Sequence, residues 1–159
     1  VWPPLSRAIL LLLMFVGGSG GSTGGAIKVV RMNVLAKHSI RELKRAVYPR
    51  RVTVIRLNGK AVPEEVSSAV LAFVILYLSV FLLSMMALSA MGLDFMSAVG
   101  AVAATLGNIG PGFGLVGPTC NYSAVPTIGK WLLSFCMLVG RLEVYTVLSL
   151  LVPGFWRKP

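Results

Sequence analysis

The chain has 159 residues, of which 56% are hydrophobic and 13% are charged, and its mean hydropathy is +0.83. This composition excludes an ordinary soluble domain and is typical of an integral membrane protein. The net charge of +10 is concentrated, because ten of the fifteen lysines and arginines lie between Lys28 and Lys60. A basic block between apolar segments predicts a cytoplasmic loop under the positive-inside rule. A nucleic-acid or lipid-binding patch is the alternative that the block leaves open.

Four apolar stretches follow one another along the chain, at residues 5–16, 66–93, 95–106 and 131–152. A helix needs about 20 apolar residues to cross the hydrocarbon core of a bilayer. The second and fourth stretches are long enough, whereas the first and third have only about a dozen residues each. The predicted order is therefore a short helix, the basic block, a spanning helix, a short helix and a second spanning helix.

Each short stretch ends in a glycine-rich segment, "VGGSGGSTGG" after the first and "LGNIGPGFG" after the third. A short helix that stops partway through the membrane and returns through such a segment is a re-entrant loop. Irregular backbone is tolerated at membrane depth only where it is buried in protein or lines a water-filled cavity. We therefore expect the backbone carbonyls of the two loops to face a solute that passes through the protein.

Both loops have the shape of the K⁺-channel filter sequence TVGYG, whose carbonyl oxygens replace the hydration shell of the ion. The residues predicted to line such a filter are Gly20, Gly21, Ser22, Asn108, Ile109 and Gly110. Gly21 and Gly110 align best, and K⁺ is expected to bind at their carbonyls. Glycine suits this role because it adopts cheaply the φ values that aim a carbonyl at a pore axis. Tight helix crossings are the alternative use of such glycines.

The segment between the loops carries a turn signal and a basic helical face. An Asn-Gly pair at residues 58–59, flanked by valines, predicts a small cytoplasmic β-hairpin. The four basic residues that share one face of a preceding helical stretch are Lys37, Arg41, Lys44 and Arg45. This face is either solvated near the lipid headgroups or a docking surface for a cytosolic partner. His38 and the two cysteines, Cys120 and Cys136, lack the spacing of a metal or catalytic site.

Arg141 lies near the middle of the last spanning segment, in "GRLEVYTVL". A charge at that depth is costly and usually faces a bundle interior or water. The functional interpretation is a cation in the permeation path, below the filter, that repels K⁺ as a gate or barrier. The alternative is that Arg141 pairs with Glu143 or extends towards the headgroups.

The stretches "GGSGGSTGGAIKVVR", "LNGKAVPEE", "AVAATLGNIGPGFG" and "GRLEVYTVL" resemble the C-terminal part of the TrkH family, in the Trk/Ktr/HKT superfamily of potassium uptake proteins. The resemblance implies an all-α membrane fold of four helix–pore-loop–helix repeats, arranged like a tetrameric K⁺ channel. Residues 1–62 would hold the pore loop and second helix of the third repeat, and residues 63–159 the fourth repeat. The first two repeats would be absent, and half a filter cannot select an ion.

The same resemblance implies a gate and partners. In the family an intramembrane loop interrupts the second helix of the third repeat and closes the pore beneath the filter. Candidate positions here are residues 24–28, with Gly24, Gly25 and Lys28, or the polar stretch around His38 and Ser39. Arg141 matches the arginine near that loop. Family members form homodimers and bind a cytosolic, TrkA-like nucleotide-binding ring.

One position departs from the family pattern. The residue before Asn108 is commonly polar in TrkH relatives and is Gly107 here, which predicts more freedom at the mouth of the filter. Filter loops enter from outside the cell, so residues 28–62 and the C-terminal tail are expected in the cytoplasm. Asp94 and residues 118–122 are then expected outside a bacterial plasma (inner) membrane.

The predicted function is K⁺ transport through a pore, with K⁺ as the transported ion and no cofactor. No set of nucleophile and base residues predicts an enzyme. The alternative is a membrane-anchored basic module that recruits a cytosolic partner or anionic lipid.

Overall fold

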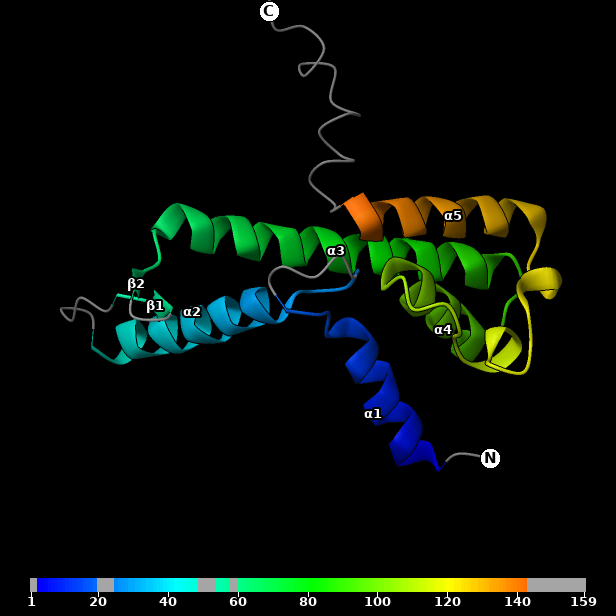
Figure 1. Cartoon of the computed structure of the whole chain (residues 1–159), viewed down its shortest axis with the longest axis horizontal. Coiled ribbons are helices and arrows are strands. Elements are labelled where there is room, and N and C mark those ends of the chain that lie inside the picture. Colours follow the sequence, from blue (N-terminus) through cyan, green and yellow to red (C-terminus); the bar gives the residue numbers. More distant parts are fainter. Residues whose placement is uncertain (1–2, 20–24, 49–53, 58–59, 143–159) are drawn as a thin grey trace, which may run out of the picture.

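The computed structural model describes residues 3–19, 25–48, 54–57 and 60–142. These residues form helices joined by loops and one short hairpin, as the sequence predicts (Figure 1). The elements in chain order are α1 (Pro4–Phe15), α2 (Val29–Val47), β1 (Arg56–Leu57), β2 (Lys60–Ala61), α3 (Glu64–Ala90), α4 (Phe95–Leu106), the 3₁₀ turns η1 (Gly114–Val116) and η2 (Tyr122–Ala124), and α5 (Thr127–Leu142).

Helices α2, α4 and α5 pack on α3, and α1 packs on α4 (Figure 1). The first half of α3 contacts α2, and its second half contacts α4 and α5, where Ser84 and Cys136 lie 3.2 Å apart. The end of α1 meets the middle of α3, because the Phe15 ring packs edge-on against Phe81 with 5.0 Å between centroids. The two glycine-rich loops therefore meet beside the middle of α3.

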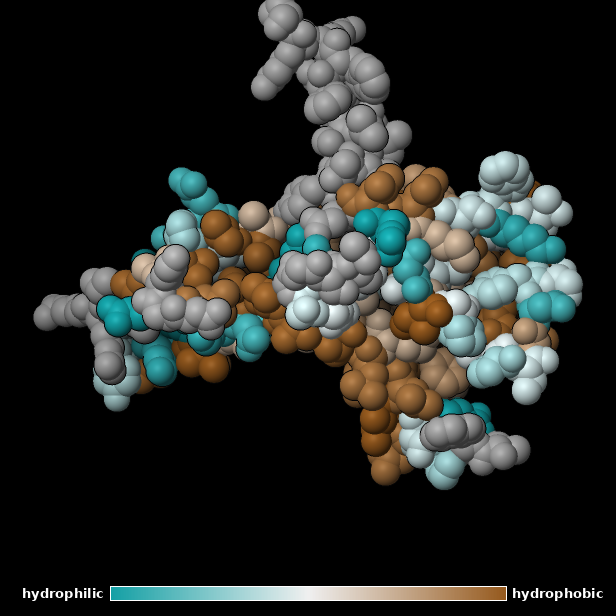
Figure 2. Space-filling model, viewed as in Figure 1, coloured by the Kyte–Doolittle hydropathy of each residue, from teal (hydrophilic) through white to brown (hydrophobic). Residues whose placement is uncertain are grey.

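The apolar length of α3 agrees with the predicted spanning helix. It has 27 residues, about 40 Å of helix, and within the described ranges it is the one helix long and apolar enough to cross a membrane. Helices α1 and α4 have 12 residues each and are too short, as predicted. Figure 2 shows apolar residues over the centre of the molecule and hydrophilic residues towards both ends.

Helix α4 is built to be surrounded by protein. Every residue from Ser97 to Leu106 is buried, and most are small, which lets the backbones of α3 and α5 approach closely. Asp94 caps the first turn by accepting a hydrogen bond from the Ser97 N–H at 3.1 Å. At the other end the helix stops at Gly107. Because the helix begins at the Asp94 cap and ends at Gly107, the loop that follows lies next to the middle of the helix bundle.

The Asp94 cap predicts a pH-dependent contribution to stability. Hydrogen bonds from Ser97, first from its side chain and then from its backbone N–H, lower the pKa of this carboxyl. The stabilising contribution is therefore present above the ordinary pKa, about 4, and is lost as the pH falls through the lowered pKa of the folded protein. We expect Asp94→Ala to lower the thermal midpoint of the purified transporter at neutral pH, and the difference to shrink as the pH falls below about 4. A pH-independent difference would show that the carboxylate charge does not act there.

The predicted hairpin is confirmed. Arg56 pairs with Ala61 and Leu57 with Lys60, so the two antiparallel strands flank residues 58–59. The hairpin packs on the basic face of α2. Lys37 Nζ donates to the Arg56 carbonyl at 2.6 Å, and the Arg41 guanidinium donates to the Glu64 carboxylate at 3.2 Å. Lys37, Lys44 and Arg45 are exposed, as a solvated face predicts, whereas Arg41 is partly buried between α2 and the start of α3.

Helix α2 runs through His38 and Ser39 without a break. The second candidate position for the helix interruption was therefore wrong. The side chain of His38 faces α3, with Nδ1 2.8 Å from the hydroxyl of the buried Ser67. Among the described residues, no three His, Cys, Asp or Glu side chains gather as a metal site would require. His38 therefore ties α2 to α3.

Candidate filter loops

The chain after α4 reverses direction and runs back along the same helix. Gly112 lies against the Gly100 backbone, where an added methyl group would come within 2.6 Å of the Gly100 carbonyl oxygen. Further along, the Leu115 N–H donates to the Ser97 hydroxyl at 2.8 Å. Residues 107–112 are thus the tip of a re-entrant loop, as the short stretch and its glycines predict.

The tip of this loop has the backbone conformation that a carbonyl-lined site needs. Asn108 and Gly110 both have positive φ, +54° and +107°. The Ile109 N–H donates to the Ala104 carbonyl at 2.8 Å, which keeps the tip on the C-terminal end of α4. That end carries the negative pole of the helix dipole and favours a cation. A methyl group added at Gly110 would meet no described residue within 4 Å, so this residue faces open space among the described parts of the chain.

Helix α5 holds the same loop from a second side. Asn108 Nδ2 donates to the Met137 carbonyl of α5 at 3.2 Å. One turn further on, Gly140 lies so close to the Leu106 carbonyl oxygen that the two backbones are in contact. Arg141 follows directly in the last turn of α5 and is exposed, and its predicted partner Glu143 lies outside the described residues. The loop and the arginine are therefore fixed to one short stretch of helix.

The first glycine-rich loop is described at both of its ends. The Gly17 N–H donates to the Ile27 carbonyl at 2.8 Å, and the Ile27 N–H donates to the Phe15 carbonyl at 3.1 Å. These bonds close the base of a loop at the end of α1. Its predicted filter residues Gly20, Gly21 and Ser22, and the gate candidate Gly24, lie outside the described residues.

The two loops touch each other through glycine. A methyl group added at Gly25 would lie 2.6 Å from the Gly107 carbonyl oxygen, and one added at Gly107 would lie 3.2 Å from the Met14 carbonyl oxygen. Gly107 is buried and has an ordinary helical φ of −76°. The expectation that Gly107 loosens the mouth of the filter was therefore wrong, since its missing side chain is used for close packing between the loops.

Residues 25–28, the other candidate position for the gate, are non-helical and precede the start of α2 at Val29. Gly25, Ala26 and Ile27 are buried, and Ala26 has a left-handed φ of +61°. A non-glycine residue in that region costs about 1–2 kcal/mol, so the surrounding contacts must hold it there. Lys28 is partly buried at the N-cap of α2. No pattern in the sequence predicted the left-handed conformation of Ala26.

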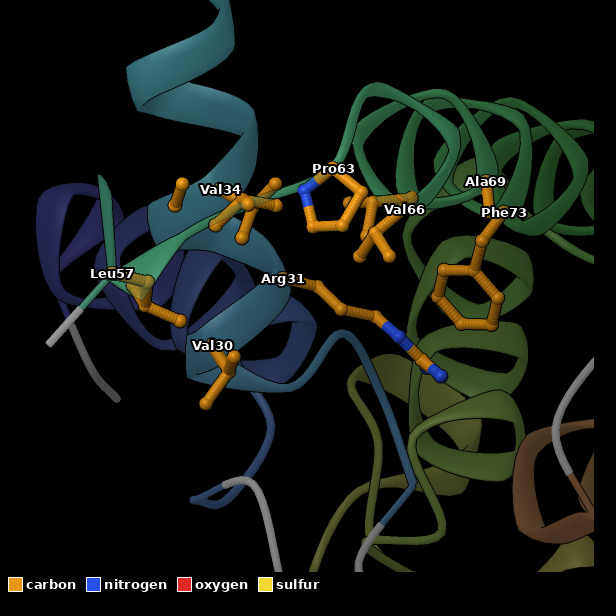
Figure 3. A pocket seen from close by; sticks show the side chains of 11 residues that line it. Val30, Arg31, Val34, Leu57, Pro63, Val66, Ala69 and Phe73 are labelled. Atoms are coloured by element: carbon orange, nitrogen blue, oxygen red, sulfur yellow. The ribbon is translucent and has the colours of Figure 1, made fainter. Parts of the chain in front are cut away.

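Arg31, in the first turn of α2, lies across a cavity of about 750 Å³ between α2, the hairpin and α3 (Figure 3). The side chains around it are apolar, among them Val34, Val66 and Phe73. The Arg31 guanidinium stacks 4.1 Å from the centre of the Phe73 ring. An aromatic ring therefore supports the charge of Arg31 at the edge of this cavity.

A family model described as TrkH, cation transport protein, matches residues 1–156. The chain belongs to the TrkH family. The Trk system potassium uptake protein TrkH of Escherichia coli K12 is 46% identical over 157 residues, which are 99% of this chain and 32% of that protein. The corresponding protein of Vibrio parahaemolyticus is 47% identical over the same coverage. This TrkH-family chain thus spans about a third of the length of the curated relatives it matches.

The TrkH fold is also found in the structure. A crystal structure of the potassium transporter TrkH from Vibrio parahaemolyticus matches with a TM-score of 0.88 and 46% identity, over 98% of this chain and 33% of that chain. The chain is therefore an integral membrane protein of a cation transport family, with an all-α fold. The sequence argument missed four residues that shape the second loop. They are Gly100 and Gly140, through backbone contacts, and Ser97 and Tyr122, through their hydroxyls. The small residues three apart at Ser97 and Gly100 were the available signal.

Proposed function

We propose that this chain contributes two loops to a pore that transports K⁺ across the bacterial plasma membrane. The observation that supports this most directly is the contact between the loops at Gly25 and Gly107, beside the open-facing Gly110. Loops that meet in this way can present their carbonyls to one ion path, where the oxygens substitute for hydration water. Transport of this kind needs no covalent chemistry and no cofactor.

Two loops enclose half of an ion path, so the pore requires further loops. Residues 1–62 supply the first loop with α1, α2 and the hairpin, and residues 63–159 supply the second with its flanking helices. The relatives that match are about three times as long as this chain. The working unit is an assembled transporter that contains this chain together with the remaining repeats. K⁺ is its substrate, with Gly21 and Gly110 as the proposed carbonyl ligands.

Arg141 is the proposed barrier of this pore. We expect Arg141→Ala to raise K⁺ uptake about fivefold at matched membrane abundance, because a like charge in a wet pore repels the ion by about 1 kcal/mol. The assay is growth and K⁺ uptake of a K⁺-uptake-deficient bacterium that carries the assembled transporter. Arg141→Lys is the matched control, since it keeps the charge and should keep the barrier.

The proposal would be abandoned if the unsubstituted transporter supported no growth on limiting K⁺. A rise in uptake with both Arg141→Ala and Arg141→Lys would instead count against a charge barrier alone. In that case the shape of the guanidinium, and not its charge, closes the path.

The cytoplasmic surface supports the proposed partners. Basic side chains of α2 and β1 and the apolar Ile40, Val54 and Ile55 line a cavity of about 230 Å³; the basic ones are Lys37, Arg41, Lys44 and Arg56. This arrangement fits an acidic segment of a cytosolic, TrkA-like nucleotide-binding ring. The chain is further proposed to work as a homodimer, with residues 28–62 and its C-terminal tail in the cytoplasm. Recruitment of a partner by this surface without ion transport is the second candidate function.

A further inference from the structure

The peptide unit between Gly110 and Pro111 has one polar group. Proline has no N–H, so the Gly110 carbonyl oxygen is the only atom through which this unit can be held by a hydrogen bond. Gly110 itself gives little resistance to rotation, because it has φ +107° and no described residue lies within 4 Å of the position of a side chain. The orientation of the carbonyl that we assign to K⁺ therefore depends on whatever bonds to its oxygen.

Tyr122 supplies that bond. Its hydroxyl donates to the Gly110 carbonyl at 2.8 Å, across twelve residues of sequence. Burial raises the pKa of the Tyr122 hydroxyl above its ordinary value, so the group stays protonated and can donate at physiological pH. A carbonyl oxygen has two lone pairs, so the bond leaves one for an ion.

The turn that carries Tyr122 is itself braced. The Asn121 side chain accepts a hydrogen bond from the Ser123 N–H at 3.0 Å, which fixes the start of η2. From α5, Lys130 Nζ donates to the Ser123 carbonyl at 3.2 Å. The Tyr122 ring packs against the hydrophobic core of the bundle. The hydroxyl therefore reaches Gly110 from a turn that is tied to α5 and to the core.

We infer that Tyr122 is a positioning residue that sets the K⁺ over Na⁺ preference of the pore by holding the Gly110 carbonyl. This inference rests on the proposed function. A carbonyl held in one orientation keeps the spacing of the oxygens around the ion, whereas a rotating carbonyl adjusts to a smaller ion as well. Loss of the bond should therefore admit more Na⁺ and leave the capacity for K⁺ largely intact.

The test uses the assembled transporter in proteoliposomes and measures K⁺ and Na⁺ uptake separately. Tyr122→Phe removes the hydroxyl and keeps the ring. We expect the ratio of K⁺ to Na⁺ uptake to fall about fivefold, the effect of losing one ordinary hydrogen bond. Tyr48→Phe is the matched control, because Tyr48 is exposed at the end of α2 and should leave the ratio unchanged. The ratio does not depend on protein abundance, so a loss of folded protein alone would not move it.

An unchanged ratio in Tyr122→Phe would overturn the inference while the proposed function stands. Should Tyr122→Phe not yield folded protein, Lys130→Met is the second variant. It removes the hydrogen bond that holds the Ser123 carbonyl, so the turn that carries Tyr122 loosens while the tyrosine side chain itself is unchanged. A fall of the ratio in Lys130→Met then supports the inference, and an unchanged ratio overturns it. If the unsubstituted transporter takes up no K⁺, the proposed function itself fails, which is a distinct result.

Discussion

Gly110→Ser is expected to lower K⁺ uptake by the assembled transporter at least about tenfold and to end growth on limiting K⁺. The reason is conformational, because an added side chain would meet nothing within 4 Å. A serine at φ +107° is strained by about 1–3 kcal/mol. At about 1.4 kcal/mol per tenfold change, this strain shifts the equilibrium away from the native loop conformation by about five- to 150-fold. Uptake of K⁺ at matched membrane abundance is the measurement.

Gly92→Ser provides a closely matched control for Gly110→Ser. Gly92, in the turn between α3 and α4, has φ +94° and also has nothing within 4 Å of the added side chain. Both substitutions therefore introduce similar strain at an open position, and only one lies in the proposed filter. Equal loss of uptake in the two variants would mean that general destabilisation is responsible, and normal uptake in Gly110→Ser would remove Gly110 from the ion path.

The sequence predicted the elements well, because hydropathy and helix length act locally. The third apolar stretch was predicted at the same residues, 95–106, that α4 occupies, and the Asn-Gly hairpin signal was followed by paired strands on either side. The re-entrant course of the second loop also followed from a short helix that ends in glycine. These features depend on turn residues and on whether backbone N–H and C=O groups find hydrogen-bond partners, and residues close in sequence determine both.

The sequence could not show which glycines serve packing and which face open space. Gly107 and Gly110 are three residues apart in the same motif, yet Gly107 is buried against the first loop and Gly110 faces open space. The difference arises from α5 and the first loop, which are distant in sequence. Arg31 is a similar case, since its support by Phe73 joins residues 42 positions apart. Contacts between distant segments, and not local propensity, decide these roles.

Gly140→Ala is expected to weaken the attachment of α5 to the filter loop. The added methyl group would overlap the Leu106 carbonyl oxygen and lie 2.7 Å from Asn108 Nδ2. A backbone carbonyl cannot rotate away as a side-chain end can, so α5 must shift, and overpacking of this kind costs about 1–3 kcal/mol or more. The thermal midpoint of the purified transporter should fall by about 1–3 °C, because the assembled transporter is about three times as long as this chain. K⁺ uptake should fall with it, because Asn108 and Arg141 move with α5.

Gly129→Ala, on the same helix, separates this steric effect from a general effect of alanine in α5. Its added methyl group would approach side chains and not backbone, those of Val125 at 2.9 Å, Leu88 at 3.1 Å and Met91 at 3.6 Å, and side-chain ends give way more easily than a backbone carbonyl. The thermal midpoint should therefore fall less in Gly129→Ala than in Gly140→Ala. If Gly140→Ala were tolerated as well as Gly129→Ala, the backbone contact between α5 and the loop would not exist in the assembled transporter. Arg141 would then lack the fixed position that the proposed barrier requires.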